Sequence, residues 1–120
     1  MPIVRIDLPY GYPEDYKERL RQAAKAAVIS ILAPAETRYV YVGVREAFAR
    51  VGDGVPTITV DLRPGRAAER KAALAEALAD SVSTIAGIGR EHIYLLFRET
   101  EAANHYCGGK PLADWAPADA

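Results

Sequence analysis

Three residues of this chain have side chains or backbone groups suited to proton transfer on a carboxylate: Pro2, Arg63 and Arg66. Removal of Met1, expected when the second residue is small, would leave Pro2 with a free secondary amine, the strongest base and nucleophile that the chain could offer. The arginines stand in the run Arg63-Pro64-Gly65-Arg66. Their planar guanidinium groups can each bind a carboxylate through two hydrogen bonds, so these residues predict an anion site.

A cation beside the amine would change its protonation. At about 5–6 Å and an effective dielectric near 20, one arginine disfavours protonation by roughly 3 kcal/mol. That energy corresponds to about two pKa units, enough to make a proline amine a general base near neutral pH. In a more hydrated or less cationic site the amine stays protonated and acts as an acid. Taken alone, however, a Met-Pro start is common and usually has no functional meaning, and Arg-Pro-Gly-Arg is typical of a solvated loop before a helix.

An internal repeat predicts the elements that would bring these residues together. Residues 56–62 repeat residues 2–8 at an offset of 54, and residues 92–99 repeat residues 39–46 after one deletion. Each half has the pattern strand, helix, strand. The predicted elements are strands at 2–8, 37–46, 56–62 and 92–99, and helices at 13–33 and 66–86. We therefore predict a single domain over residues 1–120, with unit one at about 2–46, unit two at about 56–99 and a tail at about 104–120.

The repeat predicts an α/β (α+β) fold with a four-stranded mixed sheet and two helices on one face. Each β-α-β unit makes a parallel strand pair with a right-handed crossover. If the units meet through their first strands about a pseudo-twofold axis, those strands run antiparallel. Pro2 then lies next to residues 62–66. Arg66 is expected to begin the second helix, whose first N–H groups would add positive partial charge to the site.

The other face of this sheet is unusually polar for a core. It would carry five hydrogen-bonding side chains, namely Arg5, Asp7, Thr57, Thr59 and Asp61. Such a face is either solvated, as antiparallel sheets allow, or buried against symmetry-related copies with its polar groups paired. We favour an oligomer.

Composition argues against several classes of partner. The formal net charge is −1, from 15 basic and 16 acidic residues, which disfavours nucleic acid or an anionic membrane as the main partner. No apolar run approaches the roughly 18 residues of a membrane span, and no signal-peptide pattern is visible. The single cysteine, Cys107, fits a reducing compartment. We expect a cytoplasmic protein.

The Met-Pro start, the tandem repeat and the run from Leu62 to Arg66 resemble the tautomerase superfamily, with its 4-oxalocrotonate tautomerase-like and MIF-like folds. The resemblance extends from Pro2 to about residue 109. It is strongest for two long groups, the malonate semialdehyde decarboxylases (at residues 33–39 and Arg63-Pro64) and the cis-3-chloroacrylic acid dehalogenases (at Gly65-Arg66 and residues 91–93). It implies a homotrimer in which Pro2 is catalytic, Arg63 and Arg66 bind the substrate carboxylate and Arg66 contributes to catalysis.

Departures from the two long groups favour one chemistry over another. Thr37 stands where the decarboxylase pattern has an aspartate, and Glu36 would replace it only with a shift of register. The dehalogenase histidine, tyrosine and glutamate correspond to about Ile29, Leu96 and Cys107. The leading hypothesis is therefore a cofactor-independent tautomerase (an isomerase) of enol 2-oxo acids with Pro2 as base. The alternatives are a decarboxylase or hydratase/dehalogenase of 3-oxo or α,β-unsaturated acids with protonated Pro2, and a non-catalytic ligand-binding module.

Four further residues are candidates for the pocket: Tyr39, Thr37, His105 and Tyr106. The segment 104–109 follows the last predicted strand and could close over the site from the same or a neighbouring subunit. His105 and Cys107 are not expected to form a metal site, and no metal or cofactor is predicted. Unit one has Gly11-Tyr12 in place of Gly65-Arg66, and Pro56 has no free amine. We therefore expect one site per protomer, for a small carboxylate substrate.

Overall fold

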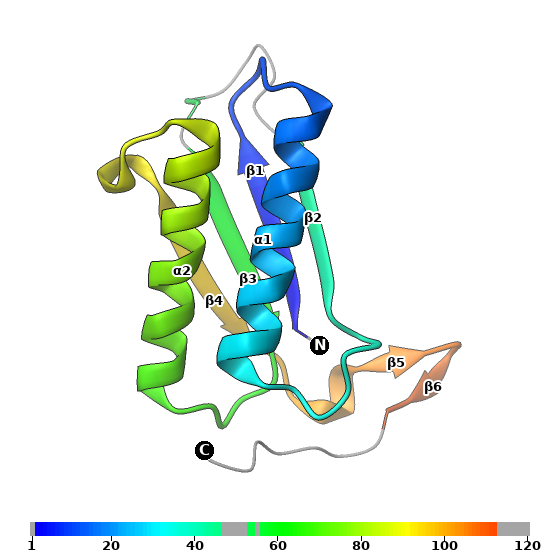
Figure 1. Cartoon of the computed structure of the whole chain (residues 1–120). Helices are drawn as coiled ribbons and strands as arrows, with labels where there is room; N and C mark the ends of the chain where they lie inside the picture. Colours follow the sequence, from blue (N-terminus) through cyan, green and yellow to red (C-terminus); the bar gives the residue numbers. More distant parts are fainter. Residues whose placement is uncertain (1, 47–52, 55, 113–120) are drawn as a thin grey trace.

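The structure, a computed structural model, describes residues 2–46, 53–54 and 56–112. Its main elements are β1 (Ile3–Leu8), α1 (Glu14–Leu32), β2 (Tyr41–Glu46), β3 (Thr57–Leu62), α2 (Ala68–Ala86) and β4 (Tyr94–Glu99). Two 3-10 turns (η1, Arg90–His92; η2, Ala102–Asn104) and a hairpin of β5 (Tyr106–Cys107) and β6 (Lys110–Pro111) complete it. The four long strands form a sheet in the order β2-β1-β3-β4, and both helices cover one of its faces (Figure 1). The predicted mixed architecture is confirmed.

The two β-α-β units meet through β1 and β3, which pair antiparallel with Ile3 opposite Asp61. Each of these central strands pairs in parallel with the second strand of its own unit. The units begin in the same way, because Tyr41 N donates to Pro2 O and Tyr94 N donates to Pro56 O, both at 3.1 Å. This repeated contact is what a pseudo-twofold axis between β1 and β3 requires.

The core lies between the sheet and the two helices. Alternate residues of β1 and β3 face the helices, and residues spaced at i and i+4 along each helix face the sheet. The fully buried members are Val4, Ile6, Leu8, Leu20, Ala24, Val28, Leu32, Val40, Ile58, Val60, Leu62, Leu74, Leu78 and Val82. Each large aliphatic side chain in such a core contributes about 1.5–3 kcal/mol. This layer fixes the position of the central strands and of the segments at their ends.

The second strand of each unit starts later than predicted. β2 begins at Tyr41 rather than at residue 37, and β4 begins at Tyr94 rather than at residue 92. The residues before them are in turns, closed by the hydrogen bonds from Val40 N to Thr37 O and from Ile93 N to Arg90 O, each 3.1 Å. The β-branched and aromatic residues of these stretches favour a strand. In unit one, however, the pairing of β2 with β1 begins only at Ile3, which lies opposite Tyr41. Strand pairing therefore overrides local propensity.

The second helix also begins later than predicted, at Ala68 with Ala67 as its N-cap. Arg66 therefore precedes the helix instead of starting it. Gly65 has a φ of 108°, and Gly11, its counterpart in unit one, has a φ of 111°. Only glycine adopts such angles readily, so both units turn sharply at the same place before their helices.

The face of the sheet that is turned away from the helices, here called the outer face, carries charged side chains that form ion pairs. The Asp61 carboxylate accepts hydrogen bonds from Arg98 at 2.8 and 3.0 Å and from Arg5 at 2.6 Å. These arginines, Arg98 first, hold the pKa of Asp61 below its usual range. Nearby, Arg45 Nε donates to Asp7 at 2.7 Å. Four of the five polar side chains predicted for this face, Arg5, Asp7, Thr57 and Asp61, thus have partners within a single chain.

Replacing Asp61 by asparagine should destabilise the fold. The carboxylate is buried between two arginines whose side chains are about half exposed, 48% for Arg5 and 53% for Arg98. Because water partly compensates the arginines, we expect a loss of about 1–2 kcal/mol in the free energy of unfolding at pH 7. Urea denaturation measures it. The difference from wild type should shrink as the pH falls through the lowered pKa of Asp61, where the wild-type carboxyl also becomes neutral.

Glu18→Gln is the matched control, since it removes an exposed carboxylate that pairs with Arg21 on α1. It should leave the free energy of unfolding nearly unchanged, because water screens an exposed ion pair. An Asp61→Asn protein as stable as wild type at pH 7 would show that the ion pairs of the outer face do not stabilise the sheet.

Candidate functional site

Pro2 lies buried at the start of β1, beside the end of β3. Its carbonyl is fixed by the hydrogen bond from Tyr41 N. Ile3 is paired with Asp61, so one step further along the antiparallel ladder places Pro2 beside Leu62, the last residue of β3. Arg63 follows directly. The pairing of the two central strands therefore brings Pro2 to the arginine-bearing loop, as the repeat predicted.

Arg63 is 7% exposed and contacts a second buried residue, His105, which is 8% exposed. Arg63 Nε donates a hydrogen bond to His105 Nδ1. Burial first, and then the nearby Arg63 guanidinium, lower the pKa of His105. The backbone of His105 is held on both sides, by donation from its own N to Ala102 O and from Leu112 N to its carbonyl, at 3.0 and 2.9 Å. The site thus contains a buried arginine against a neutral imidazole.

Arg66 is also buried, at 6% exposure, and it contacts the end of the other unit's helix. Its Nη1 donates to Leu32 O, in the last residue of α1, at 2.7 Å. At the equivalent position of unit one, Tyr12 Oη donates to Ala86 O, in the last residue of α2, at 2.9 Å. The repeat offset of 54 relates both the donors and the acceptors. A cation at a helix C-terminus is favourable, so this contact gives Arg66 a structural role that the sequence did not suggest.

The other predicted pocket residues are less enclosed. Thr37 is exposed, and Tyr106 is 62% exposed on β5. Tyr39 is half-buried in the turn before β2, with the Arg38 guanidinium 4.6 Å from its ring centroid. Their roles in a pocket stay predictions. His105 is the candidate that the structure brings into contact with Arg63.

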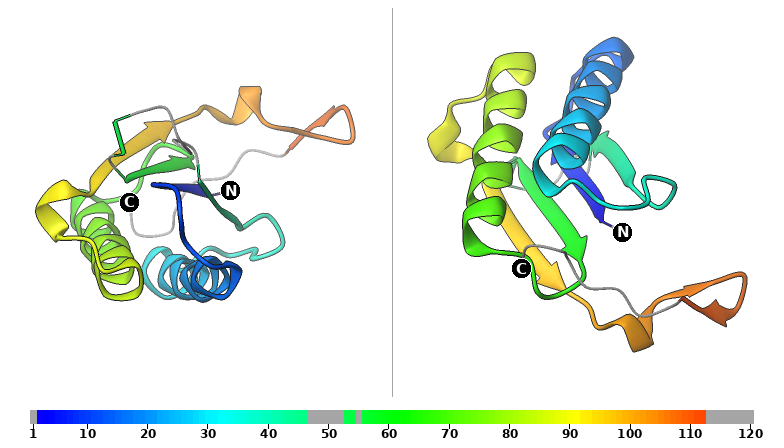
Figure 2. Two further views of the ribbon diagram at one scale, coloured as in Figure 1. Left: turned by 90° about the horizontal axis from the view of Figure 1, so that it is seen from above. Right: turned by 60° about the horizontal axis from the view of Figure 1, so that its bottom comes forward.

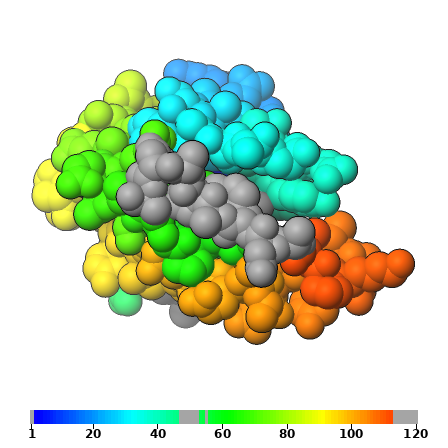
Figure 3. Space-filling model, turned by 90° about the horizontal axis from the view of Figure 1, so that it is seen from below, coloured from blue at the N-terminus to red at the C-terminus, as the bar shows by residue number. Residues whose placement is uncertain are grey.

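The segment that carries His105 continues into the β5–β6 hairpin, which stands away from the sheet in both views of Figure 2. Viewed from below, the hairpin forms the edge of the molecule (Figure 3). Cys107 is exposed there and is opposite Lys110 in the hairpin. In the part of the chain that the structure describes, no group of three or more His, Cys, Asp or Glu residues is placed to hold a metal ion.

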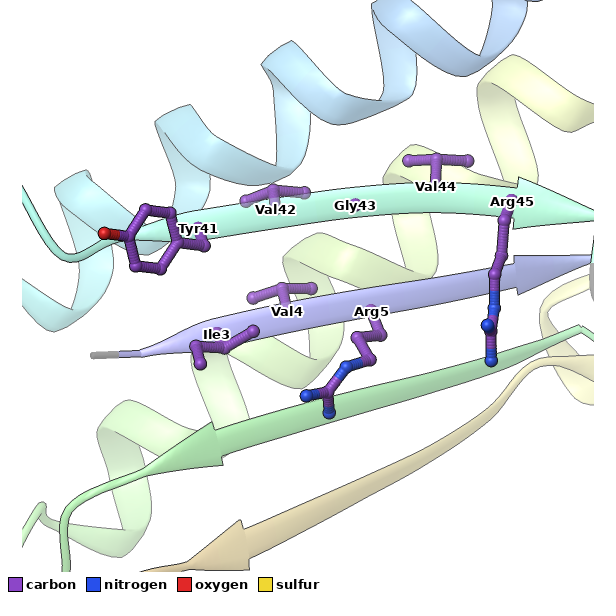
Figure 4. Close-up of a pocket in the computed structure, with 8 residues that line it drawn as sticks. All are labelled: Ile3, Val4, Arg5, Tyr41, Val42, Gly43, Val44 and Arg45. Atoms are coloured by element: carbon purple, nitrogen blue, oxygen red, sulfur yellow. The ribbon is translucent and has the colours of Figure 1, made fainter. Parts of the chain in front are cut away.

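A groove on the outer face of the sheet begins next to the Pro2 end of β1 (Figure 4). It has a volume of about 380 Å³ and lies over β1 and β2. It is lined by Ile3, Val4, Arg5, Tyr41, Val42, Gly43, Val44 and Arg45. A Cβ on Gly43 would meet nothing within 4 Å, so the missing side chain leaves the floor open. Sequence reasoning missed this groove, although a glycine inside a predicted strand marks a position at which a ligand or another chain can come close to the backbone.

None of the helices in the described residues is long and apolar enough to cross a membrane.

Solved structures with a similar fold show the fold class of this chain. A fused 4-OT, solved as a wild-type asymmetric trimer, has a TM-score of 0.80 at 20% identity, over 91% of this chain and 94% of that chain. A member of the cis-3-chloroacrylic acid dehalogenase family has a TM-score of 0.77 at 20% identity, over 97% of this chain and 85% of that chain. The chain therefore has the 4-OT-like α+β fold.

Sequence comparison gives the family. The model described as "Tautomerase enzyme" matches residues 56–114. A probable tautomerase of Bacillus cereus is 43% identical over 61 residues, which make up 50% of this chain and 98% of that relative. This chain belongs to the tautomerase family. The family match begins at Pro56, the residue that the repeat equates with Pro2, so unit two retains the family pattern while Pro56 itself lies inside the chain.

The two contacts at the helix ends can be tested as a pair. Arg66→Met removes a charged donor to Leu32 O and should lower the free energy of unfolding by about 2 kcal/mol. Tyr12→Phe removes the neutral donor to Ala86 O and should lower it by about 1 kcal/mol. Chemical denaturation measures both.

Arg38→Met is the control for loss of an arginine, because its side chain is 68% exposed, and it should be nearly neutral. If Arg66→Met unfolds like wild type, the contact with α1 contributes nothing to stability, and a functional role becomes the better reason for burying this arginine.

Proposed function

We propose that this protein is a cofactor-independent tautomerase of enol 2-oxo carboxylic acids, with the amine of Pro2 as general base and Arg63 as the main ligand of the carboxylate. The observation that carries the proposal is the β1–β3 register, which lays Pro2 beside Leu62, the residue that precedes Arg63. Membership of the tautomerase family supports the reaction class.

The proposed reaction is a proton transfer between oxygen and carbon. The Pro2 amine accepts the proton of the enol hydroxyl group, the C2–O bond becomes a carbonyl, and the protonated amine returns a proton to C3. Arg63 binds the carboxylate and stabilises negative charge that develops on the 2-oxygen. Its positive charge also disfavours protonation of a nearby amine, which keeps Pro2 in the basic form that this step needs.

Arg66 has a smaller part in this proposal. Its Nη1 donates to Leu32 O, so it contributes positive charge at the edge of the site while it holds the end of α1. A direct contact between Arg66 and the substrate stays a prediction.

We also propose that the long members of the superfamily are the groups to which this chain is most similar. The sequence resemblance is to the long decarboxylases and dehalogenases, whose reactions involve water. Thr37 stands where the decarboxylase pattern has its aspartate, and it is exposed. A site made of a proline amine and arginines transfers protons more readily than it activates water. We therefore place tautomerisation first, and decarboxylation or hydration with protonated Pro2 second.

We further propose that the protein assembles as a homotrimer through the outer face of the sheet. Three large apolar side chains on this face are exposed in one chain: Tyr41 at 54%, Tyr94 at 63% and Leu96 at 48%. Edge strands β2 and β4 carry them, on either side of the Asp61 ion pairs. The trimeric state of the fused 4-OT supports this assembly, and the groove over Gly43 would then lie at an interface.

The Pro2→Ala variant tests the function. Its N-terminal amine is a primary amine on a differently shaped residue, so we expect the ketonisation of the enol of phenylpyruvate to fall by at least about 100-fold. Ultraviolet absorbance follows the reaction, and intact mass must first confirm that Met1 is absent from both proteins. Wild-type kcat/KM should rise with pH through the amine pKa if Pro2 is the base.

The melting temperature and sedimentation of Pro2→Ala control for loss of structure. Equal rates in the two proteins, with Met1 removed from both, would exclude Pro2 as the base. A rate that falls with rising pH would favour the acid role, and with it the decarboxylase or hydratase reaction.

The Leu96→Glu variant tests the trimer. A charge at this site would be buried in the proposed interface, so we expect the variant to sediment as a monomer while wild type sediments as a trimer. Ile29→Glu is the matched control, because Ile29 is 38% exposed on the helical side of the molecule. Trimers in both variants, or a wild-type monomer, would contradict assembly through this face.

A further inference from the structure

His105 differs from the other histidine of this chain in both burial and contacts. His92 has a side chain that is 69% exposed, whereas His105 is 8% exposed and accepts a hydrogen bond from Arg63 Nε. The arginine nitrogen can only donate, so Nδ1 of His105 must carry a lone pair. The hydrogen bond thereby assigns the neutral ring its proton on Nε2. A protonated ring has no acceptor and could not make this contact.

The second nitrogen of the same ring has no equivalent contact. Nε2 of His105 is buried and has no hydrogen-bond partner among the residues that the structure describes. A buried donor left without a hydrogen bond destabilises the folded protein. A ring kept for packing alone would be better replaced by an apolar one. The bond to Arg63 is therefore the polar interaction that accounts for a histidine at this position.

We propose that His105 is a positioning residue that fixes the plane of the Arg63 guanidinium for binding the substrate carboxylate. This inference rests on the proposed function, in which Arg63 is the carboxylate ligand. A guanidinium binds a carboxylate through two parallel hydrogen bonds only when the two planes are aligned. Holding Nε on a rigid ring sets the plane in which both Nη atoms lie, and it removes rotations that binding would otherwise have to freeze.

The arrangement should make substrate binding sensitive to acid. Burial first, and then the positive charge of the Arg63 guanidinium, hold the pKa of His105 below its ordinary value. As the pH falls through that lowered pKa, the ring gains a proton, loses its acceptor and repels Arg63. KM should therefore rise on the acid side while the neutral form persists at pH 7.

Three substitutions separate the two ring nitrogens. In His105→Asn the side-chain oxygen can replace Nδ1 as acceptor, in His105→Gln the amide nitrogen lies nearer the place of Nε2, and His105→Phe keeps only the ring. With the enol of phenylpyruvate at pH 7, we expect KM to rise about tenfold in Gln and Phe, with kcat within about threefold. Asn should restore KM to near the wild-type value and remove its rise at acid pH.

His92→Gln is the matched control at an exposed site and should leave KM and its pH dependence unchanged. Imidazole ¹⁵N spectra of wild type should show the Nε2-protonated form of His105 at pH 7. Equal KM values for the Asn and Phe variants, or an Nδ1-protonated ring in wild type, would overturn the inference.

Calorimetry with pyruvate, a 2-oxo carboxylate that needs no turnover to bind, separates this inference from the proposed function. Weaker binding to His105→Phe and His105→Gln than to His105→Asn would support the positioning role even if ketonisation did not depend on Pro2. Equal binding by all three variants and wild type would refute it even if Pro2 proved catalytic.

Discussion

The antiparallel pairing of β1 with β3 is the contact on which the rest of this molecule depends. With Ile3 opposite Asp61, alternate apolar residues of both strands face the helices and the polar residues face outward. A slip of one residue would exchange the two faces, burying Arg5 and exposing Val4. The same register sets Asp61 between two arginines and lays Pro2 beside the end of β3. Core, ion pairs and candidate site thus follow from one ladder.

Around this ladder the two units are nearly symmetric, and the candidate site lies where the symmetry fails. Gly11 and Gly65 make the same turn, and Tyr12 and Arg66 bind equivalent helix ends. Because both units need these turns and helix-end contacts, the residues at these equivalent positions are explained by their roles in the fold. Arg63, by contrast, occupies the position that Pro9 holds in unit one, and the amine proposed for Pro2 has no counterpart at Pro56. We therefore propose the chemistry for Pro2 and Arg63, two positions at which the units differ.

Arg63 and Arg66 have different partners in the structure from the one that the sequence suggests. Arg63 and Arg66 look like a matched pair for one carboxylate, three residues apart on a single loop. In the structure Arg63 contacts His105, from a segment 42 residues away, while Arg66 is directed to the end of α1, 34 residues away. Neither contact leaves a local trace in the sequence, because both join segments that meet only after the helices have packed.

The sequence by itself determined the two β-α-β units, the strands that pair, the face that each helix covers and the approach of Pro2 to residues 62–66. Those properties follow from periodicity and from a repeat whose halves must bury the same kind of surface. Tertiary structure decided where β2, β4 and α2 begin, because a strand needs a paired neighbour and the glycine turn before α2 delays its first residue. It also decided that Arg66 binds a helix end and that His105 meets Arg63, since contacts between buried side chains depend on packing across the sheet and not on neighbours along the chain.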